Sequence, residues 1–176
     1  MLEKIKRPFH LVMASLNVLG TLWIVAITLL ITADVTGRAF FNAPIFGVPE
    51  IVKISVVGIV WLQMSYTLKI NGHLRSHIII DRINPRLREF CHLFTYLLGL
   101  IMFALIIYSG WDTMIDAWVD GEFEGEAPVR VPTYPIRSIV LLGAFLTSVQ
   151  FLFLFVDSLK RLVSAKDVDK ETDRRR

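Results

Sequence analysis

The sequence predicts an all-α integral membrane protein with four transmembrane helices and with both termini on the cytoplasmic side. The chain has 176 residues, of which 54% are hydrophobic, and a mean hydropathy of +0.56. It contains four long apolar stretches, with basic residues gathered beside alternate ends of them. A bilayer core about 30 Å thick requires roughly 20 apolar residues per helix, so four spans nearly use up the chain. We therefore expect one membrane domain over residues 1–176.

The first two apolar stretches cover about residues 11–33 and 51–68. The first is longer than the apolar core of a signal peptide, about 7–15 residues, and it runs on into Asp34 without a cleavage site, so we interpret it as a retained helix. Glu50 directly precedes the second stretch. A carboxylate at this place can cap the helix, because the free amides and the dipole at a helix N-terminus attract negative charge.

The third and fourth stretches cover about residues 90–111 and 136–156. The third contains no proline. The fourth follows a proline-rich approach that includes Pro132, which suits an extended entry into a helix. Residues 164–176 form a charged tail.

Lys and Arg are distributed unevenly between the two sides that this topology defines. Fifteen lie beside the chain termini and in the loop between the second and third spans, and only four lie on the opposite side. Positive residues stay in the cytoplasm, so both termini and the middle loop are expected there. In that loop, basic residues flank an apolar Ile triplet, which predicts an amphipathic turn facing anionic phospholipid headgroups. These headgroup-facing residues are Arg75, Arg82, Arg86 and Arg88.

The middle of each span lacks ionisable residues, which argues against several functions. Carriers of ions or protons place such groups inside the helix bundle. Small multidrug exchangers depend on a glutamate in their first helix, but the first span has no acidic residue before Asp34. A membrane haem protein needs paired histidines within its helices, whereas the four histidines lie near cytoplasmic span ends. Basic residues beside apolar spans do not form a nucleic-acid-binding stripe, and we expect neither an enzyme nor a cofactor.

Two clusters at the membrane surfaces each allow two interpretations. Asp34 and Arg38 are four residues apart and share a helix face. They either form an exposed ion pair of little consequence or fix the first connection against another helix or a partner chain. His77 and Asp81, with a further histidine, can line one helix face as metal ligands, but no fourth ligand is near and the flanks are basic. The membrane-surface interpretation is therefore favoured over a metal site.

Four motifs occur in order along the chain: Asp34-Val35 with Arg38 and Phe41-Asn42, then Glu50, then His77-Ile78-x-Ile80-Asp81, then Pro132. With these motifs the sequence resembles the small, Q-type membrane subunit of TRAP transporters, the tripartite ATP-independent periplasmic carriers of organic acids. It departs from this pattern in having one glutamate after Pro49, where relatives often have an aromatic residue and paired acids, and in a second Gly-His pair at residues 72–73.

The resemblance implies a multi-pass subunit of the bacterial inner membrane that has no substrate, metal or cofactor site of its own. It implies a large polytopic partner subunit that carries the substrate and sodium sites, and a periplasmic substrate-binding protein. The expected role is that of a brace for the large subunit. A stand-alone small carrier or channel remains the alternative, and the transported organic acid is left open.

Two features offer contacts for such partners. Small residues, among them Gly143, allow close helix packing. An acidic segment between the third and fourth spans can steer a soluble binding protein, because charges at the rim of an interface mainly set the association rate; simple solvation of the loop is the alternative. The segment comprises Asp112, Asp116, Asp120, Glu122, Glu124 and Glu126, with Arg130 beside them.

Overall fold

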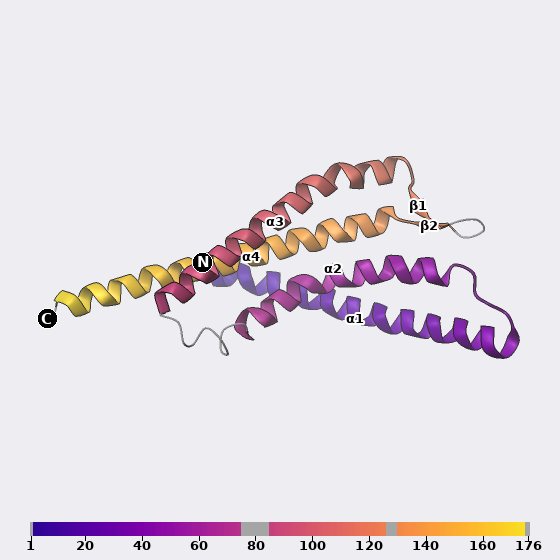
Figure 1. The fold of residues 1–176 in the computed structure, drawn as a ribbon, viewed down its shortest axis with the longest axis horizontal. Helices are drawn as coiled ribbons and strands as arrows, with labels where there is room; N and C mark the ends of the chain where they lie inside the picture. Colours follow the sequence, from indigo (N-terminus) through magenta and orange to yellow (C-terminus); the bar gives the residue numbers. More distant parts are fainter. Residues whose placement is uncertain (1, 75–84, 126–129, 175–176) are drawn as a thin grey trace.

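The computed structural model describes residues 2–74, 85–125 and 130–174, and within these ranges the chain forms four helices and two short strands (Figure 1). The elements are α1 (Leu2–Phe41), α2 (Val48–Leu74), α3 (Pro85–Val119), β1 (Phe123–Glu124), β2 (Val131–Pro132) and α4 (Tyr134–Arg174). Each of the four helices contains a segment that is long and apolar enough to cross a membrane. The predicted class of an all-α chain with four possible membrane spans is confirmed, although the helices extend well beyond the predicted spans.

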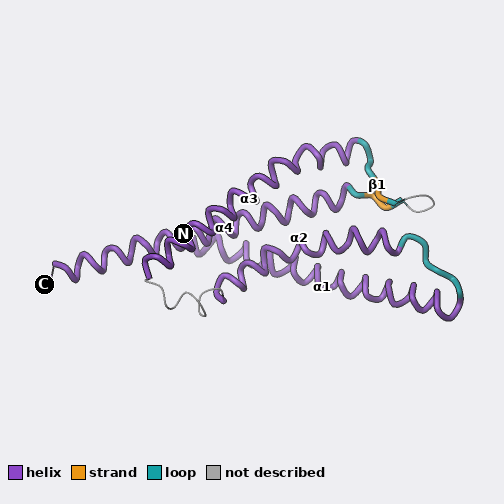
Figure 2. The backbone as a smooth tube through the Cα atoms, in the orientation of Figure 1, coloured by secondary structure: helices purple, strands orange, loops and turns teal. Residues whose placement is uncertain are grey.

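The helices pack as two antiparallel hairpins joined side by side. α1 packs along α2, α3 packs along α4, and α2 packs along α4, so that α2 and α4 lie between the two flanking helices. Figure 2 shows the connection between α1 and α2 and the β1–β2 segment at the same end of the molecule, here called the hairpin end. The opposite end, where α1 and α3 begin, is called the terminal end.

A close approach of backbones joins α2 to α4. A Cβ atom added at Gly143 of α4 would clash with the backbone oxygen of Trp61 in α2. The Trp61 ring meets Phe103 of α3 edge-on, at 6.2 Å between ring centroids, and Phe103 in turn contacts Phe151 of α4. The sequence predicts that Gly143 allows close packing against a helix of another subunit. In the structure this glycine lies inside the chain, at the contact between the two hairpins.

The flanking helices leave most of their apolar surface uncovered. In the most apolar segment of α3 only 6% of the residues are buried, whereas 39% are buried in that of α4. α1 exposes leucine, isoleucine and valine side chains along most of its length. It also exposes Thr28 and Thr32, whose hydroxyls donate to backbone oxygens one turn earlier and therefore need no other partner. These faces require lipid or another subunit to cover them.

Ion pairs tie the two hairpins together near the ends of the bundle. At the terminal end, Lys6 Nζ of α1 lies 2.6 Å from Asp157 Oδ2 of α4. Beside this pair, the rings of Phe9 and Phe153 meet edge-on at 5.3 Å between centroids. At the hairpin end, Lys53 of α2 pairs with Glu124 of β1.

We predict that Gly143→Ala destabilises the protein, because the new methyl group meets a backbone oxygen that cannot rotate away. Overpacking of this kind costs about 1–3 kcal/mol, so the thermal unfolding midpoint of the purified chain should fall by several degrees. Gly58→Ala is the matched control, since its Cβ would meet only side-chain atoms of Trp23 and Ile136, at 3.2 Å or more. Equal midpoints for Gly143→Ala and the unmodified chain would contradict the close contact.

Candidate functional site

Asp34 holds the connection between α1 and α2. Its side chain is buried, although it lies near the end of α1. One carboxylate oxygen accepts a hydrogen bond from Arg38 Nη2 at 2.7 Å, and the other accepts one from the backbone N–H of Ile45 at 2.8 Å. The helix ends where Asn42 adopts a left-handed conformation and the Ala43 N–H donates to the Gly37 oxygen at 3.1 Å. The Asp34–Arg38 pair thus fixes the path of this connection within the chain.

The connection that Asp34 holds presents aromatic rings to the surroundings. Phe40, Phe41 and Phe46 are 80%, 77% and 72% exposed. Large apolar rings near a helix end suit the headgroup region of a membrane or the face of a partner subunit. The hairpin end therefore has an apolar rim on the side of α1 and α2.

Glu50 lies in the first turn of α2. The helix begins after Gly47, which has a positive φ of 86° and accepts a backbone hydrogen bond from Ile51 at 3.0 Å. Within the described ranges no hydrogen bond to the Glu50 carboxylate is found. Any stabilisation of α2 by Glu50 then comes from its charge beside the positive end of the helix dipole.

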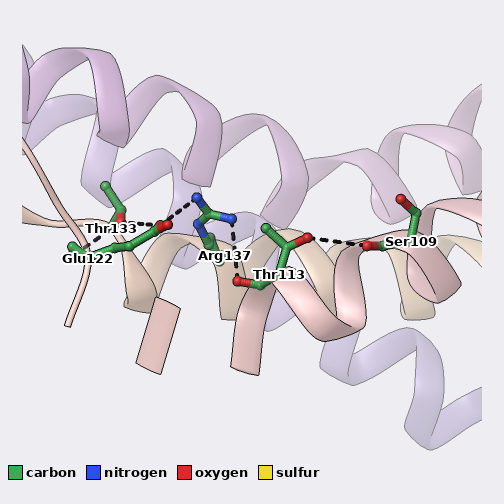
Figure 3. Close-up of polar contacts among 5 residues, drawn as sticks. All are labelled: Ser109, Thr113, Glu122, Thr133 and Arg137. Atoms are coloured by element: carbon green, nitrogen blue, oxygen red, sulfur yellow. Dashed lines mark hydrogen bonds and ion pairs between the residues drawn. The ribbon is translucent and has the colours of Figure 1, made fainter. Parts of the chain in front are cut away.

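Arg137 organises the junction between α3 and α4 (Figure 3). Its Nη2 lies 2.5 Å from Glu122 Oε2, and its Nη1 donates to the backbone oxygen of Thr113 at 3.4 Å. Thr133 adds a backbone N–H that donates to the Glu122 carbonyl at 3.0 Å. From the sequence, Arg137 is only one of the four basic residues on the side opposite the chain termini. Its place one turn after the start of a span that follows an acidic loop was the signal that could have identified this role.

The acidic segment separates into two groups with different contacts. Asp112, Asp116 and Asp120 are exposed along one face at the end of α3, and in the described part of the chain their carboxylates have no ion-pair partner. Glu122 and Glu124 instead pair with Arg137 and Lys53. The three aspartates thus form an uncompensated negative strip, called here the aspartate strip, whereas the two glutamates hold elements together.

Arg130, beside the acidic segment, contacts the first of the two short strands. β1 and β2 pair antiparallel, with Phe123 opposite Pro132. The Arg130 guanidinium lies over the Phe123 ring, 4.3 Å from its centroid, which is the geometry of a cation–π contact. Glu126 lies outside the described residues. This short hairpin closes the α3–α4 pair beside the aspartate strip.

The basic loop at the terminal end falls largely outside the described residues. This applies to Arg75, His77, Asp81 and Arg82, while Arg86 and Arg88 fall at the start of α3. The membrane-surface and metal interpretations of this loop therefore remain predictions. Within the described ranges, no group of three or more metal-ligating side chains occurs.

A model of a known protein family matches most of the chain. The matching family model is described as the DctQ component of tripartite ATP-independent periplasmic transporters, and it spans residues 27–161. This range contains the Asp34 connection, α2, α3, the aspartate strip and the apolar part of α4. Comparisons with curated proteins and with solved structures gave no match. The four-span architecture and this match show that the chain belongs to the DctQ family, the small membrane component of TRAP transporters.

Proposed function

We propose that this chain is a non-catalytic brace in a TRAP-type transporter of the bacterial inner membrane. It holds a large sodium-coupled subunit in place while that subunit moves an organic acid delivered by a periplasmic binding protein. The observation that carries this proposal is the absence of ionisable residues from the middle of all four spans, in a chain whose ionisable groups lie toward the helix ends.

The polar side chains in the middle of the spans do not form a transport site in place of the missing charged residues. Gln150 is 4% exposed. Gln63 lies against Gly20 of α1, and its Nε2 is 3.5 Å from Thr21 Oγ1. A sodium ion or an organic acid needs several oxygen or charged ligands in one accessible place. Gln63 packs between α1 and α2, whereas the Oε1 atom of Gln150 is buried without a hydrogen-bond partner among the described residues. Two amides are fewer than the ligands that such a site needs.

The exposed faces of α1 and α3 support a role as a brace. Thr28 and Thr32 lie on the outward face of α1, and their hydroxyls are already satisfied by that helix. Small residues of this kind allow another helix to approach closely, which is the main source of helix association in lipid. α1 is therefore our proposed contact with the large subunit.

The hairpin end is proposed to face the periplasm. Along the sequence, fifteen basic residues belong to the two chain termini and the connection between α2 and α3, and four lie in or beside the two connections at the hairpin end. This distribution agrees with the rule that positive residues stay in the cytoplasm. This orientation presents the aspartate strip to a soluble binding protein. Because no basic side chain in the described ranges pairs with the strip, its field extends into solvent and can raise the rate of encounter.

Reconstitution tests the brace directly. The purified chain in proteoliposomes should show no sodium-driven uptake of any organic acid, because the middle of its spans has no charged ligand and too few polar ones to form a transport site. Uptake should appear when the large subunit and the binding protein are added. Replacing Gln150 with leucine should leave that uptake within about twofold of the unmodified complex. Uptake by this chain alone would support a stand-alone carrier and refute the brace.

Association kinetics test the aspartate strip and the orientation together. In the assembled complex, Asp112→Asn/Asp116→Asn/Asp120→Asn should slow binding-protein association several-fold at low salt, because steering by exposed charges is lost. The difference should shrink as salt is added, since the Debye length falls to about 8 Å at physiological ionic strength.

The matched control removes three aspartates from the other end of the chain. Asp167→Asn/Asp169→Asn/Asp173→Asn changes the net charge by the same amount within the charged tail. It should leave the association rate unchanged. A slower rate in this control, with no effect of the strip variant, would place the binding protein at the terminal end and overturn the proposed orientation.

A further inference from the structure

A groove lies between α3 and α4 in the half of the bundle nearer the hairpin end. Its volume is about 520 Å³, within the range of about 300–1,000 Å³ that small-ligand sites occupy. α3 contributes Met102, Leu105, Ser109 and Thr113, and α4 contributes Arg137 and Val140. Figure 3 shows Arg137, Thr113 and Ser109 in succession along the bundle. The sequence does not predict this groove. Its lining residues belong neither to the Asp34 connection nor to the aspartate strip.

The length of the groove matches one leaflet of a bilayer. Met102 lies near the middle of the membrane-spanning segment of α3, Phe90–Val119, and Thr113 lies nearer its end. Eleven residues separate these two positions, which at a rise of 1.5 Å per residue is about 16 Å. Half of a hydrocarbon core is about 15 Å thick. An extended acyl chain in this groove would run from the membrane surface to its midplane.

The groove has apolar walls and one cation at its end nearest the surface. The Arg137 side chain is 34% exposed. A guanidinium has five N–H donors, and the two contacts to Glu122 and Thr113 leave others for a further acceptor. A phosphate bound there gains charge-assisted hydrogen bonds. The Glu122 carboxylate weakens the attraction between Arg137 and a phosphate. Binding therefore requires the apolar contacts and the phosphate contact together.

We propose that this groove binds one phospholipid from the leaflet at the hairpin end. One acyl chain lies along Met102, Leu105 and Val140, and the headgroup phosphate contacts Arg137. Phospholipid is the membrane component that joins an apolar chain to an anionic group at the depth where the groove places them. A helix of another subunit would need an acidic side chain at one depth to meet Arg137. The small residues that close helix packing uses line only one part of the groove, at Ser109, Gly110 and Thr113, and the deeper part is lined by large apolar side chains. The bound lipid fills the space where α3 and α4 separate and so stiffens this hairpin.

Native mass spectrometry of the full chain, released from nanodiscs of equal parts palmitoyl-oleoyl phosphatidylethanolamine and phosphatidylglycerol, tests the proposal. The unmodified chain should retain one phospholipid. Ser109→Trp, which fills the groove, and Arg137→Gln, which removes the cation, should each lower retention several-fold. Two matched controls should retain lipid normally. Tyr108→Trp changes the neighbouring residue, which is 82% exposed and does not line the groove, and Arg130→Gln removes another arginine at the same end.

The helical content of each variant shows whether it folds. If Ser109→Trp does not fold, Met102→Trp takes its place, because it fills the deep end of the groove. Nanodiscs doped with dioleoylglycerol separate the phosphate contact from the acyl-chain contact. Retention of this diacylglycerol as strong as that of phospholipid would overturn the role of Arg137. Equal phospholipid retention by the groove-filling variants and by Tyr108→Trp would overturn the site. So would a cysteine at Val140, in a Cys91→Ala background, that cross-links to a helix of the large subunit in the assembled complex.

Discussion

The approach of α4 to the backbone of α2 at Gly143 is the contact on which the rest of the structure depends. α1 packs along α2 and α3 packs along α4, so this contact decides whether the two hairpins behave as one body. Lipid surrounds the helices, and the hydrophobic effect therefore gives little drive for helices to associate. Van der Waals contact between closely spaced backbones supplies the attraction instead. A glycine is required because any side chain would meet the Trp61 carbonyl.

Ion pairs also join the two hairpins, and they do so toward the ends of the bundle. Lys6–Asp157 joins α1 to α4 at the terminal end, and Lys53–Glu124 joins α2 to β1 at the hairpin end. The Lys53–Glu124 pair is exposed, and a pair of that kind contributes little by itself, about 0–1 kcal/mol, whereas the Lys6–Asp157 pair is partly buried. Placed at opposite ends, however, the two pairs oppose rotation of one hairpin about the central contact. The middle of the bundle then needs no charge, which is the arrangement expected of a brace and not of a carrier.

The sequence predicted features that depend on spacing along one helix. The four apolar stretches identified the four spans, and the four-residue separation of Asp34 and Arg38 placed both on one face. Helix ends were predicted less well, because hydropathy marks the apolar part of a helix, whereas α1 and α4 continue as helices through polar residues.

Contacts between distant segments could not be predicted. The hydrogen bond from Ile45 to Asp34 depends on the path of a loop, and the partner of Gly143 depends on how the hairpins cross. The separation of the acidic segment into free aspartates and paired glutamates could not be predicted for the same reason. Glu122 and Glu124 differ from the aspartates only because folding brings Arg137 and Lys53 to them.

A distance measured between the two flanking helices tests the central claim that the hairpins form one rigid body. Spin labels can be placed at Leu29 of α1 and Tyr108 of α3, both exposed positions, in a Cys91→Ala background. Pulsed electron–electron double resonance of the assembled complex in lipid should give one narrow distribution of distances between the two labels. Sodium, substrate and the binding protein should leave this distribution unchanged. A broad distribution, or one that shifts when substrate and sodium are added, would show that the hairpins move during transport and would contradict the brace.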